Sequence, residues 1–171
     1  MNLEKLWEES FLDTIKEVET KSGVNSTDWR TSGRSSKKYP DKENRIWWEE
    51  NGQEMFANFV EIWRNLGWKI WATPEGVPGI EIEFNNYFGS TYIRAFADAV
   101  VTMPNGEIAV IDFKTGAYIP SSSLQLGIYA SLMETLFDIR PTRGFFYDAR
   151  NATFKESYGI NRWTIPVLTE L

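Results

Sequence analysis

A small set of charged residues in the middle of the chain has the types and spacing that phosphodiester chemistry needs. Asp112 and Lys114 lie two positions apart on a predicted strand, so their side chains share one face. Asp98 precedes a predicted hairpin turn at 104–106 and Asp112 follows it, which places the two carboxylates opposite or nearly opposite each other. Two negative charges that close repel each other unless a cation lies between them.

A Mg²⁺ or Mn²⁺ ion suits that position, because it takes one or two carboxylates and keeps several water molecules. The ammonium of Lys114 then lies where a pentavalent phosphate develops negative charge, and it can also orient or deprotonate the attacking water. Together these groups describe a metal-dependent phosphodiesterase. An Asp-x-Lys pair at a strand end is also common as a surface ion pair, so this pair alone supports both interpretations.

The composition narrows the chemistry by what it lacks. The 171 residues include no His and no Cys, which excludes a histidine base, a cysteine nucleophile, thiolate or histidine zinc sites and iron–sulfur clusters. Any metal must therefore have oxygen ligands. The net charge of −6 argues mildly against a whole-surface polyanion binder. No apolar run approaches the ~20 residues of a membrane span, and the acidic N-terminus is unlike a signal peptide, so we expect a cytosolic protein without a membrane partner.

Hydrophobic periodicity predicts an α/β, or α+β, architecture. Apolar residues at three- and four-residue steps predict helices over 3–19, about 44–66 and about 123–137. Alternating or continuously apolar segments predict strands at 68–72, 80–84, 91–102, 107–114, 144–148 and 153–157. This order predicts a single domain over 1–171, with a central mixed β-sheet flanked by helices and an extra N-terminal helix. Gly52 lies inside a predicted helix and indicates close packing there.

Residues 21–45 form a basic loop in an otherwise acidic protein. The segment contains seven Lys and Arg against three Asp and Glu. It is either a solvated loop or a surface that contacts phosphates. Its best candidates for such contacts are Arg30, Arg34, Lys37 and Lys38.

Three short segments follow one another in the sequence. They are Arg94-Ala95-Phe96-Ala97-Asp98, Ile111-Asp112-Phe113-Lys114-Thr115-Gly116 and Gln125-Leu126-Gly127-Ile128-Tyr129. In order and spacing they resemble the G-x-x-D, (D/E)-x-K-T-G and Q-x-x-x-Y motifs of the PD-(D/E)XK nuclease superfamily, in its RecB-type and phage exonuclease-like branch. Ala95 stands where Gly is usual. The resemblance covers about residues 44–150 and implies a restriction-endonuclease-like fold.

The resemblance also implies roles for individual residues. Asp98 and Asp112 would bind the metal and Lys114 would be the catalytic lysine. Glu81 resembles the acidic residue on the preceding strand that supports the metal and completes the catalytic set, with Glu83 as the alternative.

Two further positions concern the helices. Gln125 and Tyr129 lie one helical turn apart, and in the family such a pair supports the site beside the metal. Related nucleases often carry G-x-x-x-H on the helix before the sheet, whereas Phe56 stands at the His position here. Either Glu50 or Glu54 supplies the missing oxygen, or the site holds one metal and is slower or inactive.

The function implied by the resemblance is Mg²⁺- or Mn²⁺-dependent hydrolysis of DNA, by an exonuclease used in DNA processing or recombination. The setting implied is the cytoplasm of a bacterial or phage-infected cell. The alternative is a catalytically weak or inactive nuclease-fold module that binds DNA or a protein partner. No iron–sulfur cluster can accompany either function, since the chain has no Cys.

Overall fold

The computed structural model describes residues 2–29, 31, 37 and 42–170. The chain divides into two compact units, Met1–Arg64 and Asn65–Leu171. Among the described residues, no helix combines the length and the apolar character needed to cross a membrane.

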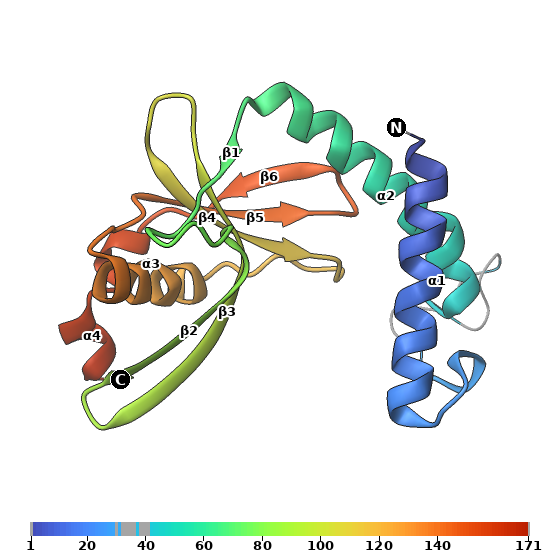
Figure 1. Cartoon of the computed structure of the whole chain (residues 1–171), viewed down its shortest axis with the longest axis horizontal. Helices are drawn as coiled ribbons and strands as arrows, with labels where there is room; N and C mark the ends of the chain where they lie inside the picture. Colours follow the sequence, from blue (N-terminus) through green and yellow to red (C-terminus); the bar gives the residue numbers. More distant parts are fainter. Residues whose placement is uncertain (1, 30, 32–36, 38–41, 171) are drawn as a thin grey trace. The chain divides into compact units, whose positions relative to one another are not determined.

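The N-terminal unit is helical (Figure 1). Its elements are α1 (Leu3–Ser22), the 3₁₀ turn η1 (Ser26–Asp28) and most of α2 (Arg45–Leu66). Asn2 caps the start of α1 by accepting a hydrogen bond from the Lys5 amide at 3.1 Å. The predicted helices are thus present, and η1 lies within the predicted basic loop.

Close packing at Gly52 is confirmed, and it joins the two helices of this unit. A Cβ atom at Gly52 would lie 2.3 Å from the Trp7 ring. The same ring stacks on Phe11 with centroids 5.3 Å apart and lies 6.0 Å from the ring of Phe56. Phe56 therefore serves to pack α2 against α1.

The C-terminal unit is built on a six-stranded mixed sheet in the order β1-β3-β4-β5-β6, with β2 also paired to β3 (Figure 1). Every pairing is antiparallel except β4 with β5, which is parallel. The strands are β1 (Lys69–Ile70), β2 (Ile80–Phe88), β3 (Thr91–Thr102), β4 (Ile108–Lys114), β5 (Arg143–Asp148) and β6 (Thr153–Glu156). The predicted mixed sheet is confirmed.

Helix α3 (Leu124–Phe137) is the crossover that a parallel β4–β5 pair requires. Its Leu126, Leu132 and Met133 are fully buried and belong to one core cluster with Val110 of β4 and Phe146 of β5. Burying each such side chain contributes about 1.5–3 kcal/mol to folding before opposing terms are counted. This packing holds α3 against the sheet, and the first turn of α3 therefore lies near the end of β4.

The sequence did not predict the C-terminal elements η2 (Ile160–Arg162) and α4 (Ile165–Thr169). Both are too short to show a helical period. They nevertheless complete the core, because Ile160 and Leu168 are buried against it.

Gly127 of α3 provides a test of this packing. A Cβ atom there would lie 2.3 Å from Cδ1 and 2.5 Å from Cβ of Trp163. Gly127→Ala should therefore destabilise the fold by about 1–2 kcal/mol, because overpacking exceeds the gain in helix propensity. The control is Gly116→Ala, where a Cβ meets nothing within 4 Å. Urea unfolding measures both, and equal midpoints for the two variants would contradict the described contact.

Candidate functional site

The carboxylates of Asp98 and Asp112 meet where the β3–β4 ladder ends. The last pair of that ladder is Ala99 with Ile111, so one further step in the same register brings Asp98 opposite Asp112. Asp98 reaches across to β4, where its Oδ2 accepts a hydrogen bond from the Phe113 amide at 2.6 Å. The predicted placement of Asp98 opposite Asp112 is thus confirmed.

Lys114 and Gln125 close a network around Asp112. The Lys114 Nζ lies 2.6 Å from Asp112 Oδ2 and donates to Gln125 Oε1 at 3.2 Å. The Gln125 Nε2 donates to Asp112 Oδ1 at 2.6 Å and to the Tyr129 hydroxyl at 2.7 Å. Strand β4 supplies the acid and the lysine, while the first turn of α3 supplies the amide and, one turn later, the phenol.

Asp112 is a buried charge whose neighbours only partly compensate it. Its side chain is 4% exposed, against 25% for Lys114. Burial raises the pKa of Asp112, and the negative charge of Asp98 raises it further, while the close ammonium of Lys114 opposes the shift. Asp112 Oδ2 has no hydrogen-bond partner within the described parts of the chain, so its close contact with Lys114 is an ion pair without hydrogen-bond alignment. This oxygen retains acceptor capacity.

Tyr129 lies at the buried end of the same network. Burial raises the pKa of its phenol, and the negative charges of Asp112 and Asp98 raise it further. The phenol therefore stays protonated at neutral pH and serves as a neutral partner of Gln125.

Glu81 is not brought into a three-carboxylate group. No set of three or more Asp, Glu, His or Cys side chains that could hold a metal occurs in the described residues. Glu81 is exposed and has a left-handed backbone with φ 49°, and it lies between the paired residues Ile80 and Ile82 of β2. Glu83, the alternative, forms an ion pair with Arg94 at 2.6 Å. A role for Glu81 at the metal stays a prediction.

The other predicted contacts belong to the N-terminal unit. Glu50 and Glu54 are exposed on α2, and Lys37 is exposed as well. Arg30, Arg34 and Lys38 lie outside the described residues. Metal binding by either Glu and DNA binding by the basic loop both stay predictions.

Sequence reasoning missed a second acid–lysine pair beside the first. In the parallel ladder Lys114 is the partner of Asp148, which is 3% exposed. Asp148 Oδ2 accepts hydrogen bonds from Asn151 Nδ2 at 2.8 Å and Lys155 Nζ at 3.0 Å. Burial acts to raise the pKa of Asp148, but these bonds outweigh burial and lower it. The sequence shows Asp148 at the end of an apolar strand, but its position beside Lys114 becomes apparent only once the order of the strands in the sheet is known.

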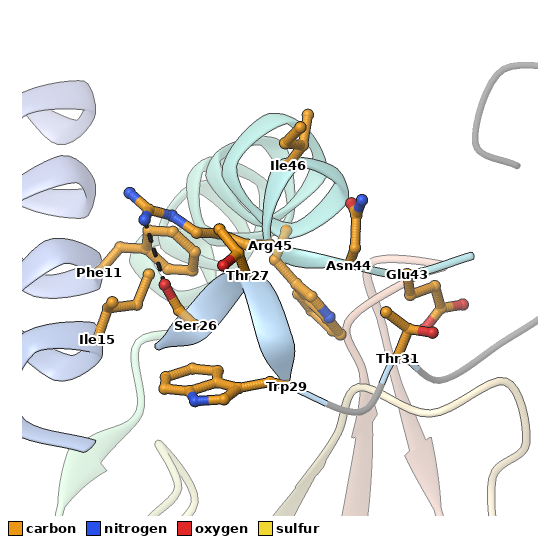
Figure 2. A pocket seen from close by; sticks show the side chains of 11 residues that line it. Phe11, Ile15, Ser26, Thr27, Trp29, Thr31, Glu43, Asn44, Arg45 and Ile46 are labelled. Carbon is orange, nitrogen blue, oxygen red and sulfur yellow. Dashed lines mark hydrogen bonds between the residues drawn. The ribbon is translucent and has the colours of Figure 1, made fainter. Parts of the chain in front are cut away.

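A separate pocket of about 380 Å³ lies within the N-terminal unit (Figure 2). Aromatic side chains of Phe11, Trp29 and Trp48 contribute to its lining. Arg45 donates from Nη1 to Ser26 Oγ at 3.2 Å at its edge. The described residues that line this pocket include no arrangement of acids and lysine like that around Asp112.

A sequence model of the PD-(D/E)XK nuclease superfamily matches residues 3–162. The chain belongs to this superfamily. The match includes the whole Asp98–Asp112–Lys114–Gln125 arrangement, and the mixed sheet with its flanking helix agrees with the PD-(D/E)XK fold.

Two phage proteins are similar to the chain, and both are named only as gene 69 proteins. The one from Mycobacterium phage D29 is 32% identical over 125 residues, covering 70% of this chain and 45% of the relative. The one from Mycobacterium phage L5 is 31% identical over 135 residues, covering 72% and 45%. The chain thus spans less than half the length of these curated relatives.

The donor set fits the divalent ion that PD-(D/E)XK nucleases generally use. Two carboxylates on neighbouring strands, one with an oxygen that has no hydrogen bond among the described residues, match the one or two carboxylates that Mg²⁺ or Mn²⁺ takes while it keeps its waters. In this chain Asp98 and Asp112 would hold the ion, with the remaining positions open to water and phosphate oxygens.

The raised pKa of Asp112 predicts a stability cost for the site. Because the fold disfavours the charged carboxylate, stability falls as pH rises from the ordinary carboxyl pKa through the raised one. Asp112→Asn should therefore raise the Tm in EDTA at pH 7, by about 2–4 °C. The matched control is Asp13→Asn on the surface of α1, which should change the Tm little. A lower Tm for Asp112→Asn in a thermal melt would show that the ion pair with Lys114 outweighs burial.

Proposed function

We propose that the chain is a metal-dependent deoxyribonuclease, acting as an exonuclease in DNA processing or recombination in the cytoplasm of phage-infected bacteria. The observation that carries the proposal is the bonded group of Asp112, Lys114 and Gln125 with Asp98 beside it, in a member of a nuclease superfamily. The relatives from two phages support the setting. Because the chain spans 45% of these relatives, the activity of a whole protein of that kind is equally a proposal.

Asp98 and Asp112 are the proposed metal ligands, with Glu81 as a third that would have to approach them. A bound Mg²⁺ or Mn²⁺ would polarise the phosphate and lower the pKa of a coordinated water. The buried position of Asp112 keeps bulk water from competing for its carboxylate, and Asp98 is anchored to β4 through the Phe113 amide. Both ligands are therefore fixed before the substrate arrives.

Lys114 is the proposed catalytic lysine. Its ammonium contacts Asp112 and Gln125 and lies over the Phe146 ring, 5.6 Å from the centroid. The positive charge would stabilise the negative charge that builds on the phosphate, and one N–H would orient the attacking water. Gln125 and Tyr129 are positioning residues, since they fix Asp112 Oδ1 and hold the lysine at the same time.

The DNA is proposed to contact the basic loop as well as the site. Lys37 is exposed, and Arg30, Arg34 and Lys38 lie nearby in the sequence. We propose that the two compact units are parts of one nuclease domain over 1–171 with its core at about 44–150, since the superfamily match runs through both units.

Two observations favour a second function. The described residues contain no group of three metal ligands, and Phe56, at the position where the resemblance implies a His, packs on Trp7. Both observations are consistent with a catalytically weak or inactive nuclease-fold module that binds DNA or a protein partner. The intact Asp98, Asp112 and Lys114 favour the nuclease.

End-labelled single- and double-stranded DNA provides the test, with Mn²⁺, Mg²⁺ or EDTA. We expect cleavage only with a metal, and a loss of at least about 100-fold in kcat for Lys114→Ala and Asp112→Asn, because each removes a charge that acts on the transition state. A product ladder that shortens from one end would identify an exonuclease.

The control for these variants is Asp138→Asn, which makes the same chemical change at the exposed C-cap of α3, where Asn also suits the left-handed backbone. It should cleave at the wild-type rate. DNA left intact by folded wild-type protein under every metal condition would contradict the nuclease. DNA binding in that same sample would favour the binding module.

A further inference from the structure

A row of side chains crosses three strands of the sheet on the face that α3 covers. Asp112 of β4 is paired with Phe146 of β5, and Phe146 is paired with Lys155 of β6. Paired residues in neighbouring strands project from the same face. Strands are spaced about 4.8 Å apart, so the Cα atoms of Asp112 and Lys155 lie about 10 Å apart, a span that adjacent nucleotides of one strand can cover.

Lys155 is fixed by an ion pair with Asp148 but remains accessible to solvent. Its Nζ lies 3.0 Å from Asp148 Oδ2, and its side chain is 50% exposed while that of Asp148 is 4% exposed. Asn151 also binds Asp148, through its side chain at 2.8 Å and its amide at 3.3 Å. The ammonium has three donors and uses one of them on Asp148, which leaves the others directed away from that carboxylate.

The surface beside Lys155 is hollowed and adjoins the candidate site. The hollow has a volume of about 440 Å³, and Phe146, Lys155, Ser157 and Tyr158 are among the residues that line it. The Lys114 ammonium lies over the ring of Phe146 in a cation–π contact, so this one aromatic side chain borders both the hollow and the candidate site. Tyr158 is 82% exposed at the hollow and offers a ring for a base to stack on.

We propose that Lys155, positioned by Asp148, binds a backbone phosphate of the DNA one or two nucleotides from the bond that is cleaved. This inference rests on the proposed nuclease function, and it assigns a direction to the substrate, from the Asp112–Lys114 group across Phe146 toward β6. A lysine that only neutralised the buried Asp148 would give the same ion pair but no contact with DNA. The two roles are separable by experiment.

The test measures binding of a fluorescent single-stranded oligonucleotide by anisotropy, with Ca²⁺ replacing Mn²⁺ and a gel to verify that the DNA stays intact. Lys155→Gln should weaken binding about fivefold and reduce the slope of log K against log salt by about one. Lys69→Gln, the same change at an exposed residue of β1, should leave both unchanged. Lys155→Arg, which keeps the charge, should bind nearly as wild type.

A double variant serves as the control for the structural role of the Asp148–Lys155 ion pair. If Lys155→Gln lowers the Tm because Asp148 loses its partner, Asp148→Asn/Lys155→Gln should recover the Tm without recovering DNA binding. With Mn²⁺ present, Lys155→Gln should raise KM for DNA and leave kcat within about twofold, as expected for a contact made equally in ground and transition states.

Equal affinity and equal salt slope for Lys155→Gln and Lys69→Gln would overturn the proposal, as would recovery of DNA binding in the double variant. These outcomes are separate from failure of the nuclease itself. If wild type binds DNA through Lys155 but cleaves none, the proposed activity fails and the phosphate site stands. If wild type binds no DNA, both fail.

Discussion

The buried carboxylate of Asp112 is the constraint on which the rest of the site depends. A charge at 3% exposure requires compensation, and Lys114 and Gln125 supply it within 2.6 Å. That requirement fixes the first turn of α3 over the end of β4, because Gln125 must reach both the acid and the lysine. The parallel β4–β5 crossover provides this geometry, and the apolar packing of α3 on the sheet maintains it. Asp112 Oδ2 has no hydrogen-bond partner among the described residues and is held only by the ion pair with Lys114, so a metal ion would have to share this oxygen with the lysine or displace it.

Much of the unit that holds the site could be predicted from the sequence. The turn at 104–106 sets the β3–β4 register, so Asp98 and Asp112 could be placed opposite each other, and the helical period put Gln125 and Tyr129 on one side of α3. Asp148 could not be placed, since an acid at a strand end acquires a role only when the order of strands in the sheet is known. The left-handed backbone of Glu81 could not be predicted either, because the strict alternation of apolar and charged residues over 80–84 predicts a regular strand.

The helix before the sheet shows how a family position can change its role. Phe56 stands where the resemblance to RecB-type nucleases leads one to expect a His, and its ring lies 6.0 Å from that of Trp7. Gly52, at the start of the same motif, allows that Trp ring to approach the α2 backbone. The segment retains the motif's glycine for packing. The proposed metal site therefore rests on Asp98 and Asp112 of the sheet, while metal binding by Glu50 or Glu54 of α2 stays a prediction.

We propose that Asp98 and Asp112 form a divalent-metal site despite the ion pair that Asp112 makes with Lys114. Calorimetric titration of the metal-free protein with Mn²⁺ tests this site most directly, using wild type, Asp98→Asn and Asp112→Asn. We expect saturable binding by wild type and at least about tenfold weaker binding by both variants, because each loses a charged oxygen ligand. Binding of Mn²⁺ that is unchanged in both variants, or absent from folded wild-type protein, would contradict it.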